Sequence, residues 1–250
     1  MLTILSVQCL PSGYDRGEKM QEPRLELPGR GSKFACAMAL LVGCSPILLD
    51  QVVPPWGIPA ALLAIWLVLR QQGQSLAVVG LITPPNGWPQ TLMLGVGGGF
   101  LILALSEFAY PLLLNLLGLP GQDISSYEGI EGNNGLLAIY LTVSWTTAGF
   151  GEEIIFRGFL MAGLARCLGM SKAAWIAAMI VSSILFGLIH IRTGIGGVLT
   201  TGATGAVLAG LYLLSRRSIW AAYIAHGSAN TVAFLLIYSG LYKSLPWVVS

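Results

Sequence analysis

Two adjacent carboxylates, Glu152 and Glu153, interrupt a long apolar stretch of the chain, and Arg157 follows them. Charged side chains at the depth of a lipid bilayer cost about 3 kcal/mol each on insertion scales and usually mark functional sites. Glu153 and Arg157 have the spacing of an ion pair on one helix face. Glu152 projects about 100° away from Glu153, so the two carboxylates can have different roles.

The alternative interpretation of this charged cluster is structural, as a set of buried charges that fixes the packing of neighbouring helices. Two acids facing one base leave one carboxylate uncompensated, which is costly in a packing role. A functional site is therefore the preferred interpretation.

The only two histidines of the chain, His190 and His226, also lie in apolar segments, and Asn230 shares a helix face with His226. Taken singly, a histidine or an asparagine in such a place is more often structural, for example as an interhelical hydrogen bond. A carboxylate near a histidine can take a proton from water, and a second histidine and an amide can donate hydrogen bonds to an oxyanion. Together these groups suffice to hydrolyse a peptide bond without a covalent intermediate.

A metal-assisted route stays open, because Glu152, His190 and His226 also make a plausible set of zinc ligands. The chain contains neither the Gly-x-Ser-x-Gly string of a serine hydrolase nor the His-Glu-x-x-His string of a zinc protease. Its four cysteines form no Cys-x-x-Cys pair, and they predict neither a disulfide framework nor a cysteine metal site.

The composition places these polar residues in a membrane protein. Of the 250 residues, 55% are hydrophobic and only 10% are charged, whereas a soluble domain has about 25% charged residues. The long apolar runs predict an all-α, polytopic membrane bundle with about seven transmembrane helices, or eight. A net charge of +2 is too small to suggest a nucleic-acid partner.

Seven apolar segments are expected to form these helices, and the fourth, which carries the acid pair, is too long to be one upright span. The glycines of the sixth predict a close approach between helices, with flexibility as the alternative. We divide the chain into a polar tail (1–33), N-terminal transmembrane helices (34–134), a catalytic membrane core (135–240) and a short C-terminal tail (241–250). The expected helices are 34–53, 56–70, 91–117, 135–166, 173–191, 196–214 and 218–239.

Most lysines and arginines fall in the loops on the side of the N-terminus. The positive-inside rule then predicts a multi-pass membrane protein with a cytoplasmic N-terminus, and the short loops favour a prokaryotic plasma membrane. Counting about 1.5 Å per residue puts His190 nearer the outer face than His226. The two can meet only if residues 169–176 lie at the membrane surface or the helices tilt strongly.

Three strings in this order resemble the motifs of the CPBP intramembrane proteases. That family groups type II CAAX prenyl endopeptidases with bacteriocin-processing and bacteriocin self-immunity (Abi) proteins. The resemblance covers about 135–240, including the glycine-rich stretch 196–212. The strings are Glu152-Glu153-Ile-Ile-Phe-Arg157, Phe186-Gly-Leu-Ile-His190 and His226-Gly-Ser-Ala-Asn230.

The resemblance implies a role for each motif residue. Glu152 would be the general base that activates water, assisted by His190. The oxyanion site would come from His226 and Asn230, while Glu153 and Arg157 would shape the first motif and orient Glu152. Gly227 departs from the alanine that often follows the family's last histidine.

An intramembrane endopeptidase is therefore the leading hypothesis. It implies membrane lipid and a membrane-associated or lipidated peptide as partners and requires no cofactor, with zinc as the alternative. A non-catalytic immunity or scaffold protein of the same fold is a second hypothesis. A third is a proton-coupled transporter in which Glu152, Glu153 and His190 relay protons.

Overall fold

The computed structural model describes residues 38, 40–42, 45 and 56–244, and every regular element within them is a helix. The all-α prediction is confirmed for this part of the chain. The predicted helix 34–53 falls mostly outside the described residues, as do the tail 1–33 and the last six residues of the tail 241–250.

The count of seven membrane-spanning helices is not confirmed. Within the described residues, three helical stretches are long and apolar enough to cross a membrane, and two shorter apolar helices accompany them. The long stretches are Trp88–Leu116, Ile191–Leu214 and Trp220–Tyr238, and the shorter helices are Gly57–Gln71 and Lys172–Leu188.

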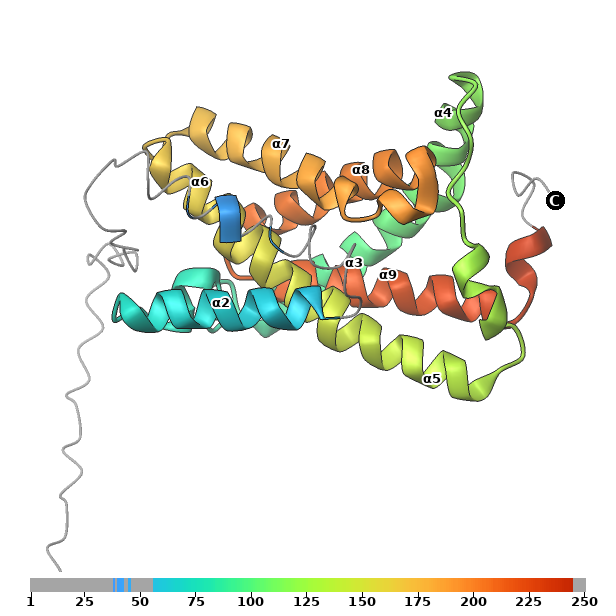
Figure 1. The fold of residues 1–250 in the computed structure, drawn as a ribbon, viewed down its shortest axis with the longest axis horizontal. Coiled ribbons are helices and arrows are strands. Elements are labelled where there is room, and N and C mark those ends of the chain that lie inside the picture. The colour runs from blue at the N-terminus through green and yellow to red at the C-terminus, as the bar shows by residue number, and fades with distance from the viewer. Residues whose placement is uncertain (1–37, 39, 43–44, 46–55, 245–250) are drawn as a thin grey trace, which may run out of the picture.

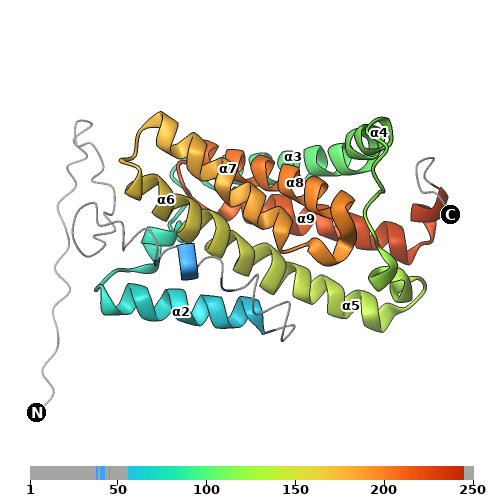
Figure 2. The same ribbon diagram turned by 45° about the horizontal axis from the view of Figure 1, so that its top comes forward.

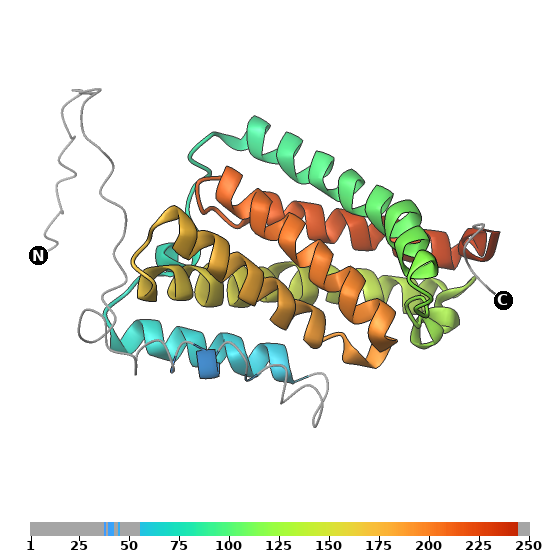
Figure 3. The same cartoon turned by 90° about the horizontal axis from the view of Figure 1, so that it is seen from above.

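The first half of the described chain forms α2 and a long rod. Helix α2 (Gly57–Gln71) is followed by the short turn η1 (Leu76–Val79). The rod runs through α3 (Trp88–Ala104), the π-helical η2 (Leu105–Ala109) and α4 (Tyr110–Leu116). In Figure 3, α2 and α3 lie at opposite edges of the bundle.

The segment predicted as one helix over 135–166 is a continuous rod, but its centre is not a regular α-helix. It begins as α5 (Asn134–Val143), where the side chain of Asn133 caps the first turn by accepting from the amide of Leu136 at 3.1 Å. It widens into π-helix over η4 (Ser144–Glu152) and η5 (Ile154–Met161), then ends as α6 (Ala162–Cys167). Such widenings occur frequently at functional sites, and here they enclose the acid pair.

Cys167, at the end of α6, is disulfide-bonded. The spacing of the cysteines predicted no disulfide framework and did not indicate this bond.

The last three apolar helices follow as α7 (Lys172–Leu188), α8 (Gly194–Leu214) and α9 (Trp220–Tyr238), with the turns η6 (Ile191–Thr193) and η7 (Leu241–Ser244). Helix α7 packs along α8, and α3 packs along α9 (Figure 1). Helix α2 lies beside η4 and η5, the π-helical centre of the segment that runs from α5 to α6 (Figure 2). The π-helical acid segment is therefore enclosed by neighbouring helices.

The crossing of α7 and α8 depends on glycine at both sides of the contact. A Cβ atom at Gly187 would collide with the carbonyl oxygen of Val198 and would lie 3.1 Å from the Cα of Gly202. The prediction of close helix approach is thus confirmed here, whereas Gly210 has open space around it. Because α7 has only 17 residues and ends at Leu188, His190 lies at the corner just beyond this crossing.

Replacing Gly187 by Ala is expected to destabilise the protein, because the obstructing atoms belong to backbone that cannot rotate away. Overpacking of this kind costs about 1–3 kcal/mol, and we expect a fall of several degrees in the apparent Tm of the detergent-purified protein. Gly210→Ala is the matched control on α8 and should leave the Tm unchanged or slightly higher. Equal Tm values for the two variants would contradict the tight crossing.

Candidate active site

Glu153 is the centre of the polar site. Its Oε1 accepts a hydrogen bond from Nη1 of Arg157 at 2.9 Å and another from Nδ1 of His226 at 3.0 Å. The predicted i,i+4 ion pair between Glu153 and Arg157 is therefore present. Both residues are buried, since Glu153 is fully enclosed and Arg157 is 1% exposed. One carboxylate oxygen therefore joins the first motif to the third.

Arg157 extends the network to two further helices. Its Nη2 donates to the backbone carbonyl of Gly205 on α8 at 3.0 Å. Its guanidinium carbon lies 4.3 Å from the centre of the Phe186 ring on α7, a distance typical of a cation–π contact. The charge of Arg157 is thus held by an acid, a carbonyl and an aromatic face.

Phe186 brings the two histidines together. Its ring centre lies 5.2 Å from that of His190 and 5.8 Å from that of His226, and its other neighbour is Phe156 at 5.2 Å. The predicted difficulty of bringing His190 and His226 to one depth is therefore met by their packing on one shared ring. The placement of residues 169–176 at the membrane surface stays a prediction.

The hydrogen bond of His190 indicates which ring nitrogen carries a proton. Nδ1 lies 2.9 Å from the carbonyl oxygen of Phe186, and a carbonyl can only accept. We therefore assign the N–H to Nδ1, which leaves Nε2 as the nitrogen that can take a proton. His226 likewise turns Nδ1 toward Glu153, so Nε2 is its other functional atom.

Glu152 and Asn230 complete the predicted set. Glu152 is the residue before Glu153 and is buried, with 8% of its surface exposed. Asn230 is half-buried, one turn after His226 on α9. Within the described residues the Asn230 amide makes no hydrogen bond and is not among the fully buried polar atoms, so it can accept or donate to a bound molecule.

Gly227 has a structural reason to lack a side chain. A Cβ atom there would lie 2.6 Å from the indole ring of Trp145 in η4. The indole nitrogen of Trp145 donates to the hydroxyl of Thr231 at 3.0 Å, which holds the ring against α9. The departure from the family's usual alanine is therefore matched by Trp145, a partner that the sequence alone did not indicate.

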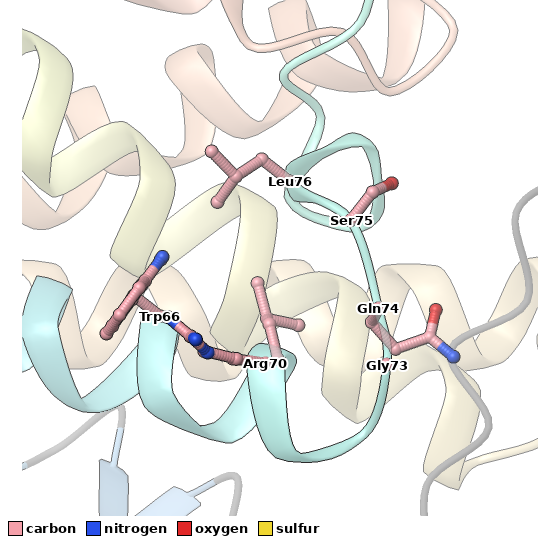
Figure 4. Close-up of a pocket in the computed structure, with 7 residues that line it drawn as sticks. Trp66, Arg70, Gly73, Gln74, Ser75 and Leu76 are labelled. Carbon is pink, nitrogen blue, oxygen red and sulfur yellow. The ribbon is translucent and has the colours of Figure 1, made fainter.

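Two recesses on the described surface lie outside the polar cluster. One of about 360 Å³ is at the end of α2, where Arg70 lies over Trp66 with 5.2 Å between the guanidinium carbon and the ring centre (Figure 4). The other, of about 260 Å³, lies between α3 and α9 beside Trp145. Neither recess is lined by any of the six predicted site residues.

The zinc alternative at Glu152, His190 and His226 stays a prediction. In the described part of the chain, no three His, Cys, Asp or Glu residues come together in a group that could hold a metal ion. The Nδ1 atoms of both histidines face protein oxygens, which leaves each Nε2 as the ring nitrogen that could bind a metal.

Sequence reasoning named all the charged members of the cluster but missed the groups that hold them. Phe186 was quoted as part of a motif without a role, although its position four residues before His190 places it on the same helix face. Gly205 contributes only a backbone carbonyl, which no side-chain pattern reports.

The fold and the site define an all-helical membrane protein with a buried Glu–Arg–His cluster. Residues 134–232 match the family model described as type II CAAX prenyl endopeptidase Rce1-like. This match confirms the resemblance of this segment to the CPBP family. No curated protein and no solved structure matches the chain.

The matched family supports a general class of activity and a location for this protein. Members of the Rce1-like family are usually proteases, which supports an enzyme that acts on a membrane-associated peptide. The family and the three long apolar helices together support an integral membrane location.

Replacing Gly227 by Ala is expected to lower the apparent Tm, because the new methyl group meets the Trp145 ring and costs about 1–3 kcal/mol. Adding Trp145→Phe should relieve the clash, so the double variant should be more stable than the sum of the single effects predicts. Gly97→Ala, at a position on α3 with no atom within 4 Å of the new Cβ, is the control. Additive losses would argue against direct contact.

Proposed function

We propose that this protein is an intramembrane endopeptidase of the CPBP type, which hydrolyses a peptide bond with a water molecule activated by Glu152 and His190. The observation that carries the proposal is the convergence of three motifs on Glu153, Arg157 and Phe186. The family supports a membrane-anchored or lipidated peptide as substrate, and a prenylated CAAX peptide is the first to test. The distribution of basic residues supports a cytoplasmic N-terminus in a prokaryotic plasma membrane.

In this mechanism Glu152 takes a proton from the attacking water. A carboxylate can do so when its oxygen comes within about 2.6–3.2 Å of that water. His190 assists through Nε2, since the Phe186 carbonyl holds the proton on Nδ1. The proton is then delivered to the amine that leaves.

His226 and Asn230 stabilise the oxyanion that forms on the scissile carbonyl. Because Nδ1 of His226 donates to Glu153, only Nε2 can reach the substrate, and it must carry a proton to donate. His226 therefore acts as an imidazolium in this step. Its charge balances the cluster, which otherwise holds two carboxylates and one guanidinium, and Asn230 adds an amide donor.

Glu153 and Arg157 position the other groups and do not contact the substrate. Removing one partner of a buried ion pair costs about 3–5 kcal/mol, because the other charge is left uncompensated. Variants at these two positions therefore report on folding as well as on activity.

The non-catalytic scaffold hypothesis has one observation in its favour. Glu153 and Arg157 are fully enclosed, and neither recess described above reaches the cluster. A scaffold would need the ion pair but not the chemistry of Glu152, so substitution of Glu152 separates the two functions.

Glu152→Gln is expected to lower the rate of peptide cleavage by about 10²–10⁴-fold, the usual contribution of a general base. The assay uses purified protein and a panel of quenched fluorogenic peptides, among them prenylated CAAX peptides. Glu107→Gln is the matched control, since Glu107 is a half-buried carboxylate of another helix, in η2. Full activity in Glu152→Gln and His190→Ala would show that the protein is not a peptidase of this kind.

Cleavage is expected to be insensitive to metal chelators, because no metal takes part in the proposed steps. Elemental analysis of the purified protein should give far less than one zinc ion per chain. Loss of activity in 1,10-phenanthroline that added Zn²⁺ restores would instead favour the metal-assisted route.

A further inference from the structure

Residues 117–133, which we call the strap, connect α4 to α5 and precede the segment that matches the family model. The strap contains one short helix, η3 (Ser125–Ile130). Figure 2 shows it crossing the end of the bundle, near the start of α8 and the end of α9.

The strap is fixed to both of these helices by backbone hydrogen bonds. The amide of Asp123 donates to the carbonyl of Thr193 at 3.0 Å, and the amide of Gly132 donates to the carbonyl of Tyr238 at 3.0 Å. At Gly196 a side chain would collide with the strap backbone. The strap therefore holds a defined position against the family core.

Tyr127 is the strap residue that packs into this core. Its ring centre lies 5.6 Å from those of Tyr140 on α5 and Phe234 on α9, and those two rings are 5.4 Å apart. Phe234 lies one turn after Asn230 and two turns after His226, on the same face of α9. The aromatic cluster thus adjoins the helix face that carries the proposed oxyanion site.

Burial raises the pKa of the Tyr127 hydroxyl above its ordinary value, and Tyr140 and the Glu152 carboxylate raise it further. The phenol therefore stays protonated at neutral pH and remains a hydrogen-bond donor.

This donor is not used inside the described part of the protein. The Tyr127 hydroxyl makes no hydrogen bond there, and it is not one of the fully buried polar atoms. The neighbouring hydroxyl of Tyr140, in contrast, donates to the carbonyl of Ser126 at 3.3 Å and so holds the strap. The two tyrosines of one cluster have different uses for their hydroxyl groups.

We propose that Tyr127 binds the substrate, donating a hydrogen bond from its hydroxyl to a backbone carbonyl of the peptide held between Glu152 and the strap. The inference rests on the proposed peptidase function and adds to it a substrate-binding residue outside the family segment. Recognition of the backbone suits an extended peptide of varied sequence. The strap then forms one wall of the substrate site.

The test compares Tyr127→Phe with the wild-type protein and with Tyr110→Phe, a half-buried tyrosine of α4 outside the strap, using the fluorogenic peptide that the wild type cleaves fastest. Tyr127→Phe keeps the ring and loses one neutral hydrogen bond, so kcat/KM should fall about 3–10-fold, mainly through KM. Its apparent Tm should not change. Tyr110→Phe should keep KM within twofold of the wild-type value, whatever its Tm.

Binding of the same peptide in the Glu152→Gln background gives a second readout, and Tyr127→Phe should weaken it by the same factor. Unchanged KM and binding in Tyr127→Phe, while Glu152→Gln abolishes cleavage, would overturn the role of Tyr127 alone. No cleavage of any peptide in the panel by the wild type, or full cleavage by Glu152→Gln, would overturn the peptidase function and the inference with it.

Discussion

The polar core of this protein depends on a single carboxylate oxygen, Oε1 of Glu153, which accepts from both Arg157 and His226. A charge removed from water must be compensated locally, because the low-dielectric interior cannot solvate it. The compensation comes from Arg157 on the same segment and from His226 on α9. The buried charge of Glu153 therefore fixes α9 against this segment. Arg157 continues the chain of contacts to α8 and α7. The same contacts that compensate the buried charges therefore also fix how the helices are arranged.

The packing around the cluster serves the same requirement. Gly187 lets α7 and α8 come close, and Gly227 makes room for Trp145. Both glycines stand near a histidine of the site, where a side chain would displace the helix that carries it. Phe186 contributes a ring that contacts Arg157 and both imidazoles. Small residues and one aromatic ring thus set the positions of groups that are themselves polar.

Much of this arrangement could be predicted from the sequence, and the reasons are local. Spacing gave the Glu153–Arg157 pair, apolar runs gave the helices from α2 onward, and ordered motifs gave the family segment. The bond between Glu153 and His226 joins residues 73 positions apart, and periodicity within one helix carries no information about such a partner. The carbonyl of Gly205 and the strap were missed for the same reason. The disulfide at Cys167 was missed because spacing alone does not show which cysteines meet.

The π-helical segments that surround the acid pair have a consequence for how this site can be gained or lost. A π-turn holds one residue more than an α-turn, so removing one residue from η4 would restore ordinary winding. Every residue on the amino-terminal side would then rotate by about 100° against the rest. Trp145 would leave the groove beside Gly227, although each motif string would read as before. Deletion of a single codon could thus inactivate such a protein while its motifs remained intact. When function is assigned by sequence similarity, the helical register between motifs therefore has to be compared as well as the motif residues.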